Sequence, residues 1–393
     1  MLIAAARIIT AVRAPYGAAE VLAPGYVAWE NGQIASVGPG QPPGRPDIEL
    51  GDGVLLPGLV DIQVNGYFGV ELSAADEVGW GAVARRLPET GTTAFVPTFI
   101  TAPVAEMAAA VRRAADFAPD LAGMPGAARV LGVHLEGPFI SPKRPGAHNP
   151  AWAAAPDPGA VADLLAAGRG LVRVMTLAPE LDGAMAVIRQ LTSAGVLVGV
   201  GHSDATAAQV SAAARCGARL VTHLFNAQRP LHHRDPGVVG QALADTRLVS
   251  SLIADLHHVA GQVVAIAFAA APGRICLISD ASACAGMPPG RYALGGEPIE
   301  LGEGDGTPPV RADGTLAGSA LRMDSAVANM VATGVGLADA VAAATRIPAD
   351  LIGRGDLGRI AAGAAADLTW LGDDLRTRAT WVAGRLAYGS HLG

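Results

Sequence analysis

Eight short, strongly apolar runs are the feature of this sequence that most restricts its fold. Each run is too short for a helix and too continuously apolar for a half-exposed strand, so each is typical of a strand buried on both faces. Parallel sheets covered on both sides are built from such strands. The runs lie at residues 58–64, 93–99, 130–136, 172–177, 196–202, 219–224, 249–255 and 275–280.

Segments with the apolar spacing of helices separate most of these runs. They include residues 80–89, 104–115, 184–193, 205–216 and 263–270, and Gly often closes them. A strand followed by a helix, repeated eight times, is the pattern of a (β/α)8 barrel. We therefore predict an α/β chain whose main body is a TIM-type barrel.

The two ends of the chain have a different pattern of short strands and turns. Residues 27–37 contain the hairpin signal Asn31-Gly32, and residues 367–371 and 380–386 are typical of strands. The Pro- and Gly-rich stretches at 38–46 and 287–309 indicate loops. We predict that residues 1–56 and 356–393 form one small β-sandwich domain beside a barrel of residues 57–355.

Composition excludes several classes of protein. Of the 393 residues, 51% are apolar and 16% charged, which favours a globular chain over a disordered one. A net charge of −7 without a run of Lys or Arg argues against a nucleic-acid partner. No window is apolar for long enough to span a membrane, the start lacks a signal-peptide pattern, and the cysteine spacing fits neither zinc knuckles nor a disulfide scaffold. We expect a cytoplasmic protein with no membrane partner.

Polar residues stand at the ends of the predicted strands, on the face where such barrels place their active sites. They are Gln63, Glu136, His202, His223, Asp255 and Asp280. Glu136, His202 and His223 come from three different strands and together offer what a catalytic divalent metal needs, although a single His at such a place is often structural.

Two further residues at this face leave alternatives open. His134 lies two residues before Glu136 and points to the same side of its strand, so it is either a supporting residue or a ligand. Asp280 ends the last strand, where a carboxylate beside a metal-activated water would act as general base and then general acid. The alternative for Asp280 is a helix cap.

Several motifs give the chain a family resemblance over nearly its full length. The chain is similar to the N-acetylglucosamine-6-phosphate deacetylase family of the amidohydrolase superfamily. The segments that carry the resemblance are Leu56-Pro-Gly-Leu-Val-Asp-Ile-Gln-Val-Asn-Gly, His134-Leu-Glu-Gly-Pro-Phe, Gly146-Ala-His-Asn-Pro, Gly201-His-Ser-Asp-Ala-Thr, Thr222-His-Leu-Phe-Asn-Ala, Arg234-Asp-Pro-Gly, Ser279-Asp-Ala and Gly314-Thr-Leu-Ala-Gly-Ser.

The resemblance implies hydrolysis of the acetamide of N-acetylglucosamine 6-phosphate to glucosamine 6-phosphate and acetate. It implies that Asp280 moves protons and that His148 stabilises the developing oxyanion. It further implies a homodimer in which Arg234 reaches the site of the partner subunit. The residues to which it gives the remaining roles are Glu136, His202 and His223 for the metal, Asn226 and Ala227 for the substrate, and Arg234 and His258 for the phosphate.

Two departures from the superfamily and family patterns refine these expectations. Gln63-Val-Asn65 stands where many amidohydrolases have His-x-His and two metals, so we expect one divalent ion, zinc first, with iron or another divalent ion as alternatives. Leu256 follows Asp255 where the family usually has Gly, which puts the loop near His258 in question.

Rival functions remain open at this stage. They are the same reaction on N-acetylgalactosamine 6-phosphate, another amide hydrolysis, and a non-catalytic oligomeric scaffold. The neighbouring His232 and His233 are expected to be exposed, with a role that the sequence leaves undefined.

Overall fold

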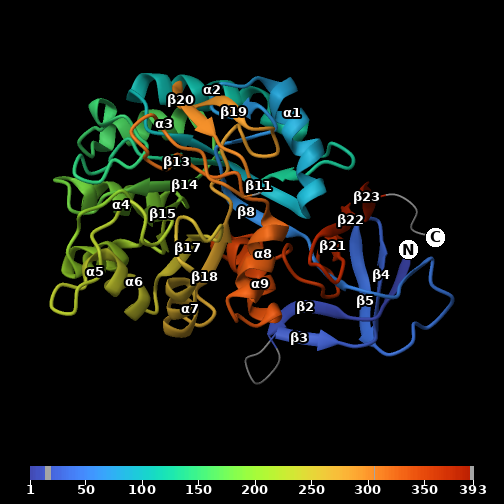
Figure 1. Ribbon diagram of the computed structural model, residues 1–393. Helices are drawn as coiled ribbons and strands as arrows, with labels where there is room; N and C mark the ends of the chain where they lie inside the picture. The colour runs from blue at the N-terminus through green and yellow to red at the C-terminus, as the bar shows by residue number, and fades with distance from the viewer. Residues whose placement is uncertain (14–18, 305, 390–393) are drawn as a thin grey trace.

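The protein is described from a computed structural model that covers residues 1–13, 19–304 and 306–389. Its main body is a barrel of eight parallel strands that are hydrogen-bonded in the order of the sequence (Figure 1). The last strand meets the first through backbone bonds, from Asp280 N to Gln63 O at 3.0 Å and from Asn65 N to Ala281 O at 2.8 Å. The strands are β8 (Leu59–Val64), β11 (Thr92–Ile100), β13 (Val133–Glu136), β14 (Val172–Leu177), β15 (Leu197–Val200), β16 (Leu220–Val221), β17 (Val249–Ile253) and β18 (Ile275–Ile278), with the short β12 (Arg129–Val130) ahead of β13.

All eight predicted strands are present. Every residue of β8, β11, β13 and β18 is buried, as expected for strands covered by the barrel interior on one side and by helices on the other. The strand predicted at 219–224 is much shorter, because the backbone turns to a positive φ of 34° at His223 and leaves the sheet. The predicted fold class is therefore confirmed.

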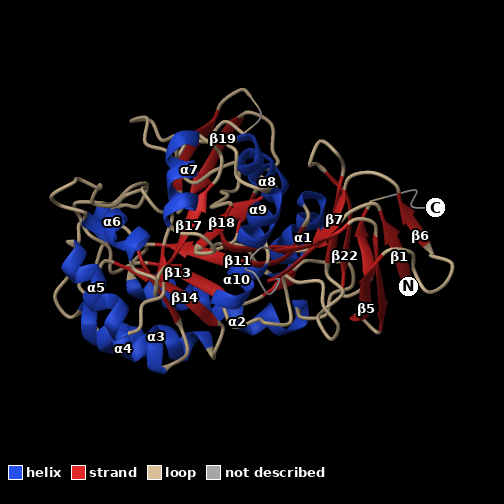
Figure 2. Ribbon diagram, turned by 90° about the horizontal axis from the view of Figure 1, so that it is seen from below, coloured by secondary structure: helices blue, strands red, loops and turns tan. Residues whose placement is uncertain are grey.

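Helices surround the strands on the outside of the barrel (Figure 2). The helix predicted at 80–89 begins earlier, where the Asp76 side chain accepts a hydrogen bond from Gly79 N, and it ends at Arg86 just before Pro88. The chain then continues as a 3-10 turn. The helices are α1 (Glu77–Arg86), α2 (Val104–Leu121), α3 (Pro158–Gly168), α4 (Ala184–Ser193), α5 (Ala207–Cys216), α6 (Gly237–Ala244), α7 (Gly261–Ala270), α8 (Met323–Ala332), α9 (Leu337–Ala344) and α10 (Arg346–Leu351), with 3-10 turns η1 (Leu87–Thr90) and η2 (Pro150–Trp152).

Both ends of the described chain lie in two sheets to one side of the barrel (Figure 1). Trp29 and Trp381 meet edge to face between the sheets, with ring centroids 6.4 Å apart. This arrangement agrees with a β-sandwich built from both termini, while the exact domain bounds, 1–56 and 356–393, stay a prediction. One sheet has the order β5 (Gln33–Pro39), β4 (Gly25–Glu30), β1 (Leu2–Ala5), β6 (Ile48–Leu50), and the other β23 (Arg385–Tyr388), β22 (Thr377–Val382), β21 (Leu368–Leu371), β7 (Val54–Pro57), β2 (Ile8–Arg13), β3 (Ala19–Leu22).

Hairpin turns explain one success and two errors of the sequence predictions. Asn31 and Gly32 have φ of 51° and 78° and connect β4 to β5, as predicted. The single strand expected at 380–386 is instead β22, a turn and β23, because residues 383 and 384 also have positive φ. The loop expected at 287–309 contains the hairpin of β19 (Gly290–Leu294) and β20 (Glu297–Leu301), whose turn is Gly295-Gly296. Another pair of short strands, β9 (Gly66–Tyr67) and β10 (Val70–Glu71), follows β8.

An ion pair joins β12 of the barrel to Asp367, the residue just before β21 of the six-stranded sheet. Arg129 Nε lies 2.9 Å and Nη2 3.2 Å from the carboxylate oxygens of Asp367, whose side chain is only 2% exposed. We expect Arg129→Met to lower the free energy of unfolding by about 2–4 kcal/mol, because it leaves a buried carboxylate without its cation. Urea unfolding measures this loss. The matched control is Arg378→Met, whose partner Asp374 is 52% exposed, and it should cost less than about 1 kcal/mol.

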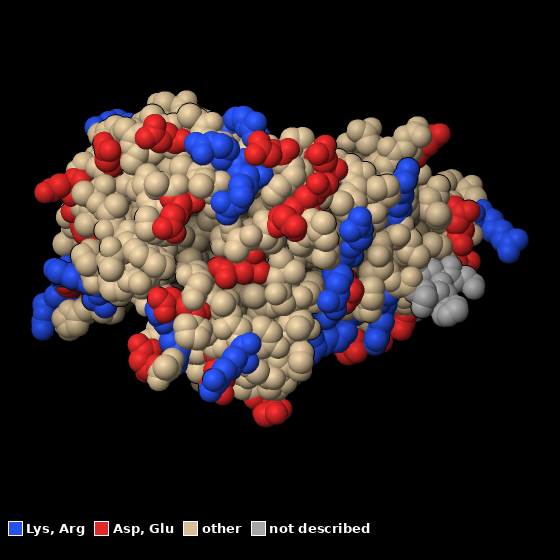
Figure 3. Space-filling view, turned by 90° about the horizontal axis from the view of Figure 1, so that it is seen from above, with Lys and Arg blue, Asp and Glu red and all other residues tan. Residues whose placement is uncertain are grey.

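The distribution of charge on one face and the hydropathy of the helices are two further features of the fold. Lys and Arg are interspersed with Asp and Glu on the face shown in Figure 3, without a broad basic patch there. Among the helices of the described residues, we find none with both the length and the hydropathy that a membrane crossing needs.

Candidate active site

A cavity of about 200 Å³ lies at the mouth of the barrel, at the carboxyl ends of the strands. It is the place where the predicted site residues come together, with the exception of Arg234. Its lining consists of Asn65, Ile100, Glu136, Gly146, Ala147, His148, His202, His223, Asn226, Ala227, Ile253, His258, Asp280, Leu294, Thr315, Leu316 and Gly318.

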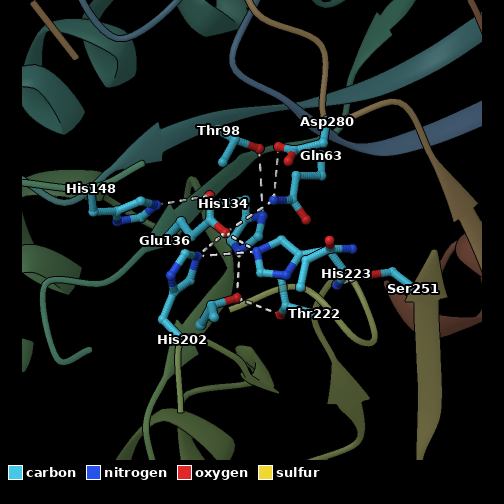
Figure 4. A network of polar contacts seen from close by, with 12 residues as sticks. Gln63, Thr98, His134, Glu136, His148, His202, Thr222, His223, Ser251 and Asp280 are labelled. Carbon is cyan, nitrogen blue, oxygen red and sulfur yellow. Dashed lines mark hydrogen bonds and ion pairs between the residues drawn. The ribbon is translucent and has the colours of Figure 1, made fainter. Parts of the chain in front are cut away.

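Glu136, His202 and His223 form a compact group inside this cavity (Figure 4). The Nε2 atoms of His202 and His223 lie 3.1 and 2.7 Å from Glu136 Oε1, and 3.1 Å from each other. A metal with tetrahedral bonds of the length usual for zinc holds its ligand atoms about 3.3 Å apart. The three side chains therefore fit a divalent ion with only a small outward movement.

The protonation of His202 and Glu136 also fits a metal. The Nδ1 atom of His202 lies 3.2 Å from the carbonyl oxygen of Arg144, so Nδ1 carries the proton and Nε2 presents its lone pair. Burial lowers the pKa of His202 to about 4, which keeps the imidazole neutral at physiological pH. Burial raises the pKa of Glu136, but the three neighbouring His rings lower it more, so the pKa of this carboxyl lies well below its usual range. For His223, burial lowers the pKa but the hydrogen bond to Glu136 raises it further, so the net shift is upward.

His148 is a geometric competitor of His223. Its Nε2 lies 3.7 Å from Glu136 Oε2, and the ligand atoms of Glu136, His148 and His202 all lie within 4.8 Å of one another. Its Nδ1 lies 2.8 Å from the Thr101 hydroxyl, which itself donates to the carbonyl oxygen of Glu136. The hydroxyl must then accept from Nδ1, so His148 can donate from Nε2 only when both ring nitrogens are protonated. We favour His223 as the ligand because its Nε2 lies closer to the Glu136 carboxylate than that of His148 does and is 3.1 Å from His202 Nε2.

Asp280 is held by two side-chain amides, that of Gln63 in the first strand, seen in Figure 4, and that of Asn65 just after it. Its Oδ1 accepts hydrogen bonds from Asn65 Nδ2 at 2.7 Å and from Gln63 Nε2 at 3.1 Å, and Gln63 Nε2 also lies 3.1 Å from Glu136 Oε1. Burial, together with the charge of Glu136, raises the pKa of Asp280 to about 6. The second oxygen of Asp280 is thus left for proton transfer, on a group that titrates near neutral pH.

Several site residues have an unusual backbone conformation. His202, His223 and Asp280 have φ of 47°, 34° and 51°, a region that L residues with side chains rarely adopt. Such strain persists only where the surrounding structure enforces it, and it concentrates at functional sites. Here it turns the side chains from the strand ends into the cavity.

His134 is a supporting residue by its position. Its Nε2 lies 2.8 Å from the Thr176 hydroxyl, the ring is 1% exposed, and it does not line the cavity. Burial lowers its pKa to about 4, so it stays neutral. Of the two alternatives for His134, a supporting residue or a metal ligand, its position favours the supporting residue.

His258, which the resemblance assigns to phosphate binding, lines the cavity and is held by Asp255. Its Nδ1 lies 2.6 Å from Asp255 Oδ2, and its backbone N donates to Asp255 Oδ1 at 2.9 Å. Leu256 lies between them with φ of 64°, a conformation that explains why Gly suits this position. The backbone keeps this conformation with Leu at position 256, and Asp255 still pairs with His258.

Arg234 is placed differently from the other predicted residues. It does not line the cavity of its own chain and lies in an exposed loop with His232 and His233, which are also exposed as expected. The two His rings are 4.2 Å apart, and Leu231 beside them is 54% exposed.

The sequence analysis missed one residue that supports the site and two leucines that line the cavity. Thr101 holds His148, and a polar residue just after the second strand was the available signal. Leu294 and Leu316 come from beyond the last barrel strand, in and after the unpredicted hairpin, and no local pattern indicates that this segment folds over the mouth.

Comparisons with known proteins identify the family and several relatives of this chain. The family model described as "Amidohydrolase family" matches residues 54–387. The chain is 40% identical to the N-acetylglucosamine-6-phosphate deacetylase of Bos taurus, over 86% of this chain and 85% of that protein. It is 39% identical to the N-acetylgalactosamine-6-phosphate deacetylase of Escherichia coli O157:H7, over 85% and 88%.

A solved structure is similar over almost the whole chain. It is the complex of an N-acetyl-D-glucosamine-6-phosphate deacetylase mutant from Mycobacterium smegmatis with N-acetyl-D-glucosamine-6-phosphate. That structure has a TM-score of 0.91 and 36% identity to this protein, with coverage of 98% and 99% of the two chains. The extent of the family match and of these similarities shows that this protein belongs to the amidohydrolase family.

Proposed function

We propose that this protein is a deacetylase that hydrolyses the acetamide of N-acetylglucosamine 6-phosphate to glucosamine 6-phosphate and acetate. The observation that carries the proposal is the convergence of Glu136, His202 and His223 with Asp280 in one buried cavity. The names of the relatives supply the sugar phosphate and the amide bond that this site acts on.

Each residue has a part in the proposed reaction. A divalent ion held by Glu136, His202 and His223 would activate the attacking water and polarise the acetamide. Asp280 takes a proton from that water through its free oxygen and later gives it to the leaving amine. His148, with both ring nitrogens protonated, donates from Nε2 to the carbonyl oxygen as negative charge develops there.

We infer that one ion is bound and that zinc suits it best. Two imidazoles and one carboxylate are a usual zinc set, although they also suit iron. Gln63 and Asn65 support a single ion, because both donate N–H bonds to carboxylates of the site and neither directs a charged or imidazole ligand to a second position.

The phosphate contacts and the assembly form part of the same proposal. Asn226 and Ala227 line the cavity beside His258, and we infer that the sugar lies against them with its phosphate toward His258. Arg234 does not line its own cavity, and the exposed Leu231 beside it supports a homodimer in which Arg234 completes the partner's site. A phosphorylated substrate also favours action in the cytoplasm, since its charge keeps it from crossing membranes.

Acetate release from two sugars tests the function. The metal-loaded protein should release acetate from N-acetylglucosamine 6-phosphate with a higher kcat/KM than from N-acetylgalactosamine 6-phosphate, and much more slowly from the sugar without phosphate. A preference for the galacto sugar would assign the rival substrate, for which the Escherichia coli relative is named. No release from either sugar would overturn the proposal and favour the scaffold.

A further inference from the structure

A second cavity lies beside the mouth of the barrel. It has a volume of about 360 Å³ and borders α2 and the turn of the β19–β20 hairpin, with Phe99, Ala102, Met107 and Trp152 among its lining residues. It has one residue in common with the candidate active site, Ile100. The two cavities are thus neighbours separated at the side chain of Ile100.

Ile100 is firmly packed in this position. It is the last residue of β11, is 9% exposed, and packs in an apolar cluster with Leu294 and Ile299 of the hairpin. Gly295, at φ of 59°, sits so close that a Cβ there would lie 2.5 Å from Ile100 Cδ1. The hairpin turn therefore holds Ile100 as the wall between the cavities.

In the proposed function, the acyl group of the substrate would face this wall. Thr101 follows Ile100 and holds His148, the residue proposed to contact the acetamide carbonyl. Asn226 follows β16, the sixth barrel strand, whereas Ile100 ends the second, so the sugar side lies across the barrel. Because a methyl group is best buried against apolar surface, it belongs beside Ile100 and Leu294.

We propose that Ile100 limits the acyl group to acetyl, by closing the candidate active site against the adjacent cavity. This inference rests on the proposed function. With a smaller side chain at position 100, the adjacent cavity would take the additional carbons of a propionyl or butyryl group against Phe99, Met107 and Trp152.

The test compares kcat/KM for N-acetyl-, N-propionyl- and N-butyryl-glucosamine 6-phosphate. In the wild type we expect a fall of about tenfold or more for each added carbon, as for other tight apolar pockets. Ile100→Ala should raise the butyryl-to-acetyl ratio by about tenfold or more, and Ile100→Val should give a smaller rise. The matched control is Ile253→Ala, at the end of β17 on the sugar side, which should change both substrates alike and leave the ratio as it is.

Because the butyryl-to-acetyl ratio is measured within each variant, a partial loss of folded protein lowers both rates equally and leaves the ratio unchanged. The variant Ile100→Val removes only one methyl group, so it disturbs the fold least. An unchanged ratio in both Ile100 variants, with normal acetyl hydrolysis by the wild type, would overturn this inference alone. Wild-type hydrolysis of the butyryl sugar as fast as the acetyl sugar would do the same. Absence of any acetyl hydrolysis by the metal-loaded wild type would overturn the proposed function itself, and this inference with it.

Discussion

Asp280→Asn is expected to lower kcat by about 10³-fold while the protein keeps its metal. Asn has nearly the same shape as Asp and can still accept from Asn65 and Gln63, but it cannot take a proton from water and deliver it to the leaving amine. Steady-state acetate release and metal content of the purified variant measure the two halves of this prediction. Retained turnover would remove Asp280 from its proposed role.

The matched control is Asp61→Asn, which changes a second buried carboxylate, on the first barrel strand. Asp61 accepts from Gln63 N and Ser279 N at 3.2 Å each, but it does not line the cavity. Burial raises its pKa to about 7, so the neutral Asn resembles a form already populated near neutral pH. This variant should lose little activity.

The pH profile gives an independent check of the same carboxylate. Asp280 must be ionised to act as a base, and burial raises its pKa to about 6. Activity should therefore be present above that pKa and fall as the pH drops through it. A bound cation favours the ionised form, so the acid midpoint of kcat/KM should lie at or below about 6. An acid limb well above this value would contradict the assignment.

Removal of the metal should abolish turnover, and return of zinc should restore it at about one ion per chain. Glu136→Gln, His202→Ala and His223→Ala should each prevent loading, because the first removes the negative charge of the carboxylate ligand and the other two each remove an imidazole ligand. Metal analysis after dialysis against zinc measures loading. Activity that survives a strong chelator would contradict the metal site.

His148→Ala separates the two geometric candidates for the third ligand. If His148 binds the carbonyl oxygen, this variant keeps its metal and loses turnover. If it is a ligand in place of His223, it loses both, and His223→Ala keeps its metal. His134→Gln is the control on the same strand as Glu136, and it should keep the metal because His134 contacts Thr176 below the site.

Much of the fold could be predicted from the sequence because its signals are local. The predicted strand at 172–177 coincides with β14 and the predicted helix at 184–193 with α4. Both patterns can be recognised from the apolar residues of a short stretch of sequence alone. The same reasoning placed Glu136, His202, His223 and Asp280 at one face, because the carboxyl ends of parallel strands meet there.

The turns were harder to predict. Only Asn31-Gly32 was recognised as a hairpin turn from the sequence. Residues 383–384 and the Gly295-Gly296 pair also have positive φ, but they were predicted as part of a strand and of a loop. Position 384 lies inside an apolar run, and Gly295 lies in a Gly- and Pro-rich stretch that has the composition of a loop.

The sequence by itself determined the barrel, the strand ends that carry the site and the types of residue available for a metal and for proton transfer. Only the tertiary structure decided that Gln63 and Asn65 hold one oxygen of Asp280, that Thr101 orients His148, and that the β19–β20 hairpin seats Ile100 between two cavities. The reason is physical. Strand and helix patterns come from interactions between neighbours in the chain, whereas these contacts join residues far apart in sequence and exist only once the barrel has closed.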